Sequence, residues 1–466
     1  MATRTEKDSL GAREVPADAY WGIQTLRARE NFPVSGLREH PRFIDAYMFI
    51  KKAAALTHAE LGVLDEERAD AIVAACDEVL SGEHRDQFVV DVFQAGAGVS
   101  FHMNVNEVLA NRALEILGEE RGDYSRLHPN DHVNMSQSTN DTIPTAMHLS
   151  TMLLWRDFEP VLEDLAAAFH DKGEAFADAI KSGRTHMQDA VPVTLGQEFH
   201  AYGAAIDRSV RTIGRAVDEL AELAIGGNAA GTGINLPDGY RPTILEHLSE
   251  LTGFELRKAA DPRERLQSHQ PIAGVSSALR NLALELIRIA NDLRLLDSGP
   301  LTGLKEISLP ARQPGSSIMP GKVNPVMPEA LNQICFHVVG ADTAVALAVQ
   351  AGQLEINVMQ PVAIWEILFS MDILKNFLPV FTEGCVEGIT ANRERMEEYA
   401  HKSPSLATAL NPVIGYAKAA EVVKKALAED RRIKDVALET TDLSEEELDE
   451  ILSPENLTGQ LEREGQ

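Results

Sequence analysis

The sequence predicts a mainly α-helical protein built around a bundle of long helices. Two segments, Ile206 to Ala224 and Leu279 to Leu296, place apolar residues alternately three and four positions apart. This spacing is typical of helices that bury one face, and both segments carry charged residues between the apolar ones. A helical bundle is the simplest arrangement that buries both apolar faces. Strand patterns separated by hairpin turns are scarce, which favours the same fold class.

Helical periodicity also divides the rest of the chain. Further helices are expected at about 42–62, 66–81, 105–117, 143–178 and 325–350. The segment 362–381 is apolar on nearly all sides, so we expect a helix in the middle of the bundle or at a subunit contact. Ser444 and Glu447 form a capping-box pattern before a short acidic helix. A change in composition after residue 396 predicts a small C-terminal domain.

Composition and charge exclude several classes of function. The 466 residues include 43 Lys and Arg against 71 Asp and Glu, which gives a net charge of −28. Such a surface repels phosphate, so neither nucleic acid nor an anionic membrane is expected as a partner. The N-terminal residues are charged, and no window offers the ~18 uncharged apolar residues of a membrane span. Three widely spaced cysteines predict a reducing compartment, so we expect a cytoplasmic protein.

Two glycine-rich segments and a histidine pair do not form the motifs that they suggest. The segment 226–233 has Thr232 where a phosphate-binding loop needs lysine. Gly96 and Gly98 lack the third glycine of a dinucleotide-binding motif and follow no strand pattern. His128 and His132 have a helical metal-ligand spacing, but Pro129 disturbs the helix, so a polar turn is the better interpretation. No metal site is expected.

Four polar segments flanked by helical patterns contain the candidate site residues. They are 102–107, 128–141, 183–189 and 315–325, the last with Glu329 four residues beyond it. Hydroxyl and amide groups with one lysine and one histidine suit the binding of a small dicarboxylate. Lys322 supplies positive charge, and the neutral groups fix the orientation of the ligand by hydrogen bonds. The fourth segment presents Ser316 and Ser317, and the alternative is that these serines only cap the next helix. No Gly-x-Ser-x-Gly sequence surrounds them, which argues against an acyl-enzyme.

Gly-Ser-Ser-Ile-Met-Pro-Gly-Lys-Val-Asn-Pro at 315–325 resembles the signature loop of the aspartase/fumarase superfamily. The similarity runs from residues 14–22 to residues 411–416, which is nearly the whole chain. The resemblance implies a mainly α, three-domain fold and a homotetramer whose central helices form a twenty-helix core. It also implies active sites built from three subunits. We place the three domains at residues 1–140, 141–395 and 396–466.

The resemblance leaves more than one substrate open. Ser138-Thr139-Asn140 and the stretch from Val326 to Phe336 are similar to members that eliminate ammonia from L-aspartate to give fumarate. Class II fumarate hydratases, which interconvert malate and fumarate, usually have Ser-Ser-Asn at the first position. Ammonia-lyase activity is therefore the leading expectation. The alternatives are fumarate hydratase activity, elimination from a modified aspartate, and a structural protein without catalysis. The last is disfavoured, because a structural protein would not need all the polar residues of the candidate site.

Matched positions imply roles for individual residues. The catalytic residues would be Ser316 as the base, His186 near the amino group, and Glu329, which orients His186. The substrate-binding residues would be Ser138, Thr139, Asn140, Thr185, Lys322 and Asn324. Of these, Ser138 and Thr139 would hold the β-carboxylate. No cofactor is implied, and activation by Mg²⁺ stays open.

Two positions depart from the superfamily pattern. Val99 stands where threonine is usual, and His102 stands where asparagine is common. A site built around the missing hydroxyl would lose roughly 1–3 kcal/mol of binding without another donor. Either Ser100 or His102 could compensate, or the substrate is a modified aspartate.

Overall fold

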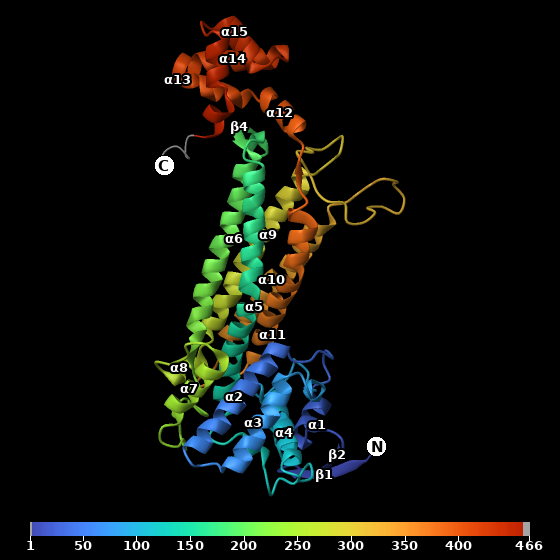
Figure 1. Cartoon of the computed structure of the whole chain (residues 1–466), viewed down its shortest axis with the longest axis vertical. Coiled ribbons are helices and arrows are strands. Elements are labelled where there is room, and N and C mark those ends of the chain that lie inside the picture. Colours follow the sequence, from blue (N-terminus) through green and yellow to red (C-terminus); the bar gives the residue numbers. More distant parts are fainter. Residues whose placement is uncertain (1, 460–466) are drawn as a thin grey trace. The chain divides into compact units, whose positions relative to one another are not determined.

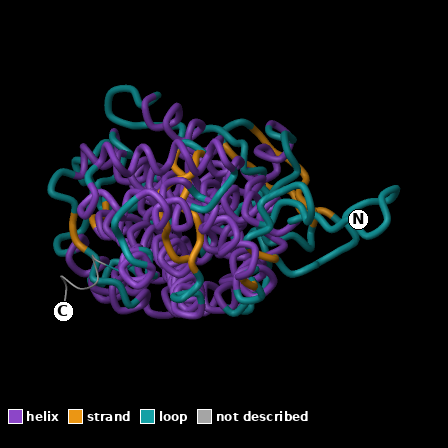
Figure 2. The backbone as a smooth tube through the Cα atoms, turned by 90° about the horizontal axis from the view of Figure 1, so that it is seen from above, coloured by secondary structure: helices purple, strands orange, loops and turns teal. Residues whose placement is uncertain are grey.

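The computed structural model describes residues 2–459, and these residues are mainly helical, as predicted. Figure 2 shows helices along most of the backbone and strands only as short pieces. The chain forms two compact units. The first contains residues 1–159, 211–283 and 336–375, and the second contains 160–210, 284–335 and 376–466.

Five long helices, labelled in Figure 1, contribute to both units. They are α5 (Thr139–Ala175), α6 (Leu195–Asp218), α9 (Gln270–Leu296), α10 (Val326–Gln350) and α11 (Gln360–Phe381). The apolar positions that predicted two of them are buried, from Ile206 to Val217 in α6 and from Leu279 to Leu296 in α9. Helix α6 ends six residues earlier than its apolar pattern, because residues 219–223 form a 3₁₀ turn and a short strand. Periodicity therefore predicted these helices well and their ends less well.

The N-terminal part of the first unit is a helical layer that starts with a hairpin. Its elements are β1 (Thr3–Asp8), β2 (Gly11–Pro16), α1 (Ile23–Asn31), α2 (Pro41–Glu60), α3 (Glu66–Leu80) and α4 (Val99–Ile116). His40 caps α2, and Pro41 occupies its first turn, where a missing N–H costs nothing. Phe43, Tyr47 and Phe101 pack ring against ring in the core between α2 and α4.

The remaining elements of the first unit are short. Helix α7 (Tyr240–Thr252) packs on α2, α8 (Pro262–Gln267) precedes α9, and β5 (Glu222–Leu223) pairs in parallel with β6 (Arg257–Lys258).

The second unit contains a hairpin that the sequence did not reveal. Strands β3 (Ile180–Thr185) and β4 (Gln188–Thr194) are antiparallel, and α12 (Arg393–Lys402) packs against β3. A second small antiparallel pair joins β7 (Ile307–Ser308) to β8 (Thr390–Ala391).

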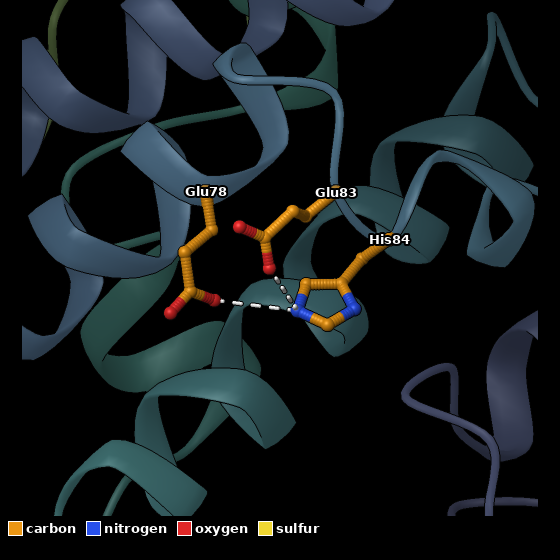
Figure 3. Close-up of side chains that lie close together, drawn as sticks. All are labelled: Glu78, Glu83 and His84. Atoms are coloured by element: carbon orange, nitrogen blue, oxygen red, sulfur yellow. Dashed lines mark ion pairs between the residues drawn. The ribbon is translucent and has the colours of Figure 1, made fainter.

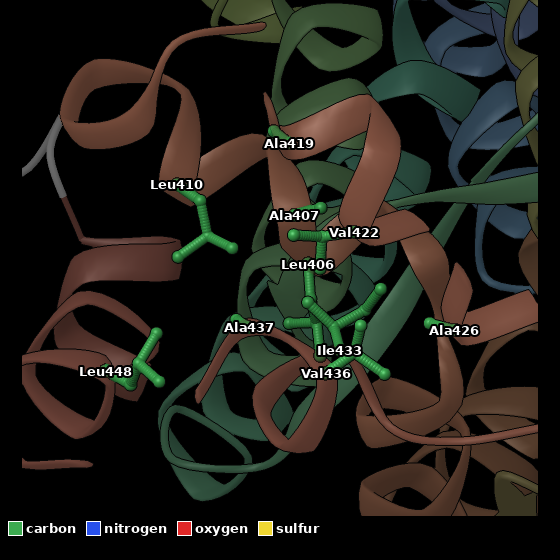
Figure 4. Close-up of a cluster of buried hydrophobic side chains, with 10 residues drawn as sticks. All are labelled: Leu406, Ala407, Leu410, Ala419, Val422, Ala426, Ile433, Val436, Ala437 and Leu448. Carbon is green, nitrogen blue, oxygen red and sulfur yellow. The ribbon is translucent and has the colours of Figure 1, made fainter. Parts of the chain in front are cut away.

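The C-terminal residues form a helical cluster with its own apolar core. Its helices are α13 (Asn411–Ile414), α14 (Tyr416–Glu429), α15 (Ile433–Thr440), α16 (Glu445–Ile451) and α17 (Pro454–Thr458). Figure 4 shows the buried side chains between Leu406 and Leu448 that hold them together. The predicted capping box at Ser444 and Glu447 is present at the start of α16. The division into three domains stays a prediction.

One helix of the described residues, α10, is long and apolar enough to cross a membrane by length and composition alone, with a mean hydropathy of 1.3. The core helix of a globular protein passes the same test. About a third of its most apolar window is buried in the single chain, and Phe336 and Leu347 are exposed. An apolar helix with exposed large side chains fits a contact with another subunit.

Candidate active site

The loop 315–325 is closed at its base by backbone geometry that requires glycine. The N–H of Gly315 donates to the carbonyl of Lys322 at 2.7 Å, and the Asn324 amide donates to the carbonyl of Gly315 at 2.7 Å. A Cβ at position 315 would lie 2.4 Å from that Lys322 oxygen, so only glycine fits. Gly321 has φ +79°, a conformation that other residues rarely adopt.

Ser316 lies inside this loop with its hydroxyl oxygen held by backbone donors. The N–H groups of Ile318 and Met319 donate to Oγ at 3.2 and 2.9 Å. Two N–H dipoles that point at one oxygen stabilise negative charge on it. The alternative that Ser316 caps α10 is not supported, because both hydrogen bonds lie inside the loop and α10 begins ten residues later.

The rest of the loop faces solvent in the single chain. Ile318 is 83% exposed and Met319 50%, while Lys322 and Glu329 are also exposed. Exposed apolar side chains beside a candidate base are consistent with a loop that is covered when ligand binds.

Thr185 and His186 lie at the tip of the β3–β4 hairpin. His186 and Met187 form a two-residue turn with φ of 54° and 60°, and Thr185 pairs with Gln188 across it. Left-handed backbone is uncommon outside glycine, although His, Asn and Asp adopt it more often than other residues. A turn of this kind twists with the strands that it joins. Both predicted site residues are exposed at this tip.

A buried ion-pair group fixes the base of the same hairpin. Glu306, which has no exposed surface, pairs with Lys181 of β3 at 3.1 Å and with Arg184 at 2.9 Å. Glu198 of α6 pairs with Lys181 at 2.8 Å. The exposed tip is therefore joined to a base that buried ion pairs hold in place. Sequence reasoning missed this group, since the partners are far apart along the chain.

Among the described residues of the second unit, no hydrogen bond or ion pair joins Glu329 to His186. The predicted pairing of these two residues stays a prediction.

Ser138, Thr139 and Asn140 lie in the first unit, where α5 begins. The buried Asp141 carboxylate holds this start in place, because it accepts N–H hydrogen bonds from Ser138 at 3.0 Å, from Gly226 at 3.0 Å and from Asn228 at 2.8 Å. Backbone N–H groups of the glycine-rich segment 226–233 therefore bind the Asp141 carboxylate of the same chain. This use of the segment agrees with the prediction that it is not a phosphate-binding loop.

Behind Thr139 lies a buried lysine that the sequence analysis did not single out. Lys51 of α2 is fully buried, and its Nζ lies 2.9 Å from Nε2 of His102, 3.0 Å from Oδ1 of Asn134 and 2.9 Å from Oε1 of Gln137. Nδ1 of His102 lies 2.7 Å from Oγ1 of Thr139. The sequence held one indication that Lys51 is buried. Lys51 follows Tyr47 by one helical turn and so lies on the apolar face of α2.

The two departures from the superfamily pattern lie in different surroundings. His102 is only 1% exposed, so it cannot contact a substrate itself. Val99 is 39% exposed and lines a cavity of about 460 Å³ together with Ser100 and His128. The cations Lys7 and Arg27 border the same cavity.

The histidines and acidic groups that could suggest a metal have other partners. His128 Nδ1 accepts the N–H groups of Asn130 and Asp131, and His132 Nδ1 accepts the N–H of His128, which makes a polar turn as predicted. Figure 3 shows a second group, in which Nε2 of His84 faces the carboxylates of Glu78 at 3.3 Å and Glu83 at 4.0 Å. The Arg112 guanidinium binds both oxygens of Glu78 and already balances its charge.

Comparison with known proteins identifies the family. The lyase family matches residues 11–340, and the fumarase C C-terminus family matches residues 406–459. An aspartate ammonia-lyase from a Bacillus species is 48% identical over 98% of this chain and 97% of its own length. A class II fumarate hydratase from Halobacterium salinarum is 51% identical over 98% of this chain and 97% of its own. A solved fumarate lyase:delta crystallin from Brucella melitensis has a TM-score of 0.94 and 49% identity, covering 97% of this chain and 99% of that one.

The chain is thus a lyase. It belongs to the aspartase/fumarase superfamily, as its signature loop predicted.

Proposed function

We propose that this lyase is an aspartate ammonia-lyase, which converts L-aspartate to fumarate and ammonia. The observation that carries the proposal is Ser316, whose Oγ receives two backbone N–H groups inside a glycine-bounded loop. Such an oxygen can bear negative charge and so act as a base. The choice of aspartate rests on Ser138-Thr139-Asn140 and on the residues that open α10, which resemble the ammonia-lyase form.

The proposed reaction is an anti elimination. The deprotonated Oγ of Ser316 removes a proton from Cβ and becomes a hydroxyl. The electron pair of the C–H bond moves into the adjacent β-carboxylate, which becomes an aci-carboxylate. Ser138 and Thr139 stabilise the additional charge on that group by hydrogen bonds. The pair then forms the C=C bond as the C–N bond breaks, and the amine leaves with its electron pair as ammonia, near Asn140 and His186.

The α-carboxylate is held by the other predicted residues. Lys322 supplies a positive charge, and Thr185 and Asn324 supply neutral donors. In the single chain, the Asn324 amide closes the loop on Gly315, so its contact with substrate depends on how the loop closes. Glu329 fixes the tautomer of His186 from another subunit.

The quaternary structure follows from the same proposal. We infer a cytoplasmic homotetramer in which α10 and its neighbours pack between subunits and each active site takes residues from three chains. The exposed Phe336 and Leu347 support this, because a large apolar side chain in water costs free energy that a subunit contact recovers. The proposed steps need no organic cofactor.

Fumarate hydratase activity is the second candidate. The observation that favours it is the identity of this chain to the class II fumarate hydratase of Halobacterium salinarum, 51% against 48% for the Bacillus ammonia-lyase. A third candidate, elimination from a modified aspartate, is favoured by Val99, which lacks the usual hydroxyl.

An absorbance assay separates the candidates. The purified protein is mixed with L-aspartate or with L-malate, and fumarate is followed by its ultraviolet absorbance, with the Ser316→Ala variant as the control for contaminating host enzymes. Fumarate from aspartate, and none from malate, is the expected result. Fumarate from malate alone would overturn the proposal in favour of the hydratase, and fumarate from neither would indicate another substrate or a protein without catalysis.

A further inference from the structure

The buried contacts of Lys51 determine where the proton of His102 lies. Burial lowers the pKa of Lys51 to about 7, while the nearby charge of Asp141 favours its ammonium form. In that form the amine has donors only, and the three groups around Nζ are one ring nitrogen and two amide oxygens. Nε2 of His102 must therefore accept, which leaves the ring proton on Nδ1. Burial and the charge of Lys51 both hold the pKa of His102 well below its ordinary value, so the ring stays neutral. Beside a protonated Lys51, the neutral Nδ1–H tautomer is the one that leaves Nε2 free to accept.

The tautomer in turn fixes the direction of the Thr139 hydroxyl. Nδ1–H donates to Thr139 Oγ1 at 2.7 Å, so the oxygen acts as an acceptor on that side. The hydroxyl proton must then point elsewhere. Thr139 is half-buried rather than enclosed, and it opens the long helix α5, whose N-terminus attracts anions. The free proton is therefore available to an anionic ligand.

We propose that His102 is a positioning residue whose tautomer, set by Lys51, makes the Thr139 hydroxyl a hydrogen-bond donor to the substrate carboxylate. This inference rests on the proposed function, in which Thr139 binds that carboxylate. Asparagine at 102 could donate an N–H to Thr139 but would not reach Lys51 in the same way.

Two substitutions at 102 separate the two contacts of the ring. His102→Gln places an amide oxygen near the position of Nε2, so Lys51 keeps its acceptor while Thr139 loses its donor. His102→Asn places an amide N–H near the position of Nδ1, so Thr139 keeps a donor while Lys51 loses its acceptor. The two variants therefore have opposite effects on binding and on the environment of Lys51.

Binding of succinate, a dicarboxylate that does not react, is the readout, measured by calorimetry on the assembled protein. His102→Gln should weaken binding about tenfold, the effect of one hydrogen bond to a charged group, and His102→Asn should restore it to within about twofold of wild type. In a Thr139→Val background, His102→Gln should have no further effect. Equal losses in both variants, or the same loss without the Thr139 hydroxyl, would overturn the proposal.

Further controls keep the result interpretable. Thermal unfolding and subunit number show whether each variant has folded, and unchanged binding in a folded His102→Gln protein also counts against the proposal. If that variant does not assemble, ¹⁵N NMR of histidine-labelled wild type decides, with His102→Asn to assign the signal. The Nδ1–H tautomer is expected, and the Nε2–H form or a charged ring would contradict it. Since succinate resembles the ligands of both lyase activities, a wrong choice between aspartate and malate leaves this test intact, whereas Thr139→Val binding like wild type would show that Thr139 is misplaced.

Discussion

At the scale of single residues, Ser316 is the group whose surroundings are most specific. Its Oγ receives the N–H groups of Ile318 and Met319, whereas the neighbouring Ser317 is exposed. Ser316→Ala removes the proposed base, and loss of general-base catalysis typically lowers kcat by about 10²–10⁴-fold. We expect a loss of at least this size, with subunit assembly unchanged, measured as the rate of fumarate formation.

Ser317→Ala is the matched control, because it removes a hydroxyl one position away in the same loop. This variant should keep its activity within a few-fold of wild type. Similar activity in both alanine variants would remove Ser316 from the role of base.

At the scale of elements, the β3–β4 hairpin depends on Glu306. This carboxylate is fully buried against Lys181 and Arg184, and removal of one partner from a buried ion-pair group typically costs about 3–5 kcal/mol. Glu306→Ala should lower the unfolding temperature and also impair catalysis, because the hairpin carries Thr185 and His186. Thermal unfolding and a full kinetic analysis check this.

The salt bridge between Arg393 and Asp178 provides the control for the hairpin. It lies in the same unit but is more exposed, so Asp178→Ala should change the unfolding free energy by less than about 1 kcal/mol. An effect of Glu306→Ala no larger than that of Asp178→Ala would mean that the buried group does not support the hairpin.

Another element-scale prediction concerns His148 of α5. It is buried, its Nδ1 lies 3.0 Å from the carbonyl of Leu220, and burial lowers its pKa from 6.5 to about 3. As the pH falls, His148 takes up a proton in the unfolded chain at a higher pH than in the folded protein. The stability contributed by this neutral ring is therefore present above pH 6.5 and is lost as the pH falls toward 3.

The variant His148→Asn keeps a donor for Leu220 and does not titrate. The difference in unfolding free energy between wild type and variant should shrink by up to about 1.4 kcal/mol for each pH unit below 6.5. Comparing the variants cancels the titration of other groups, such as Glu39, whose pKa burial raises to about 8. A difference that does not vary with pH would show that His148 is not buried as a neutral ring.

Some parts of the fold and of the candidate site could be predicted from the sequence, and others could not. The long helices were predicted because periodicity is local, and the signature loop was found because its residues are contiguous. The β3–β4 hairpin was missed since its turn, His186-Met187, contains none of the residues that mark such turns. Lys51 was missed for another reason, because its partners His102, Asn134 and Gln137 become neighbours only in the folded chain.

At the scale of the whole molecule, the proposed tetramer depends on the apolar face of α10. Leu347 is 61% exposed in the single chain. Leu347→Glu would place a charge in the proposed subunit contact, so we expect smaller particles by light scattering and a large loss of activity, since each site needs three chains.

Leu427 of α14 provides the control, because it is 64% exposed and lies in the C-terminal cluster. Leu427→Glu should leave both assembly and activity near wild type. A Leu347→Glu protein that remains a tetramer would place the subunit contact elsewhere.

The proposed mechanism depends on the position of the Ser316 oxygen relative to the substrate. A crystal structure of the assembled protein with bound succinate tests this directly. With the loop closed, we expect Oγ to lie about 3–3.5 Å from a methylene carbon whose carboxylate contacts Thr139. A closed loop with that oxygen turned away from the methylene group would contradict it.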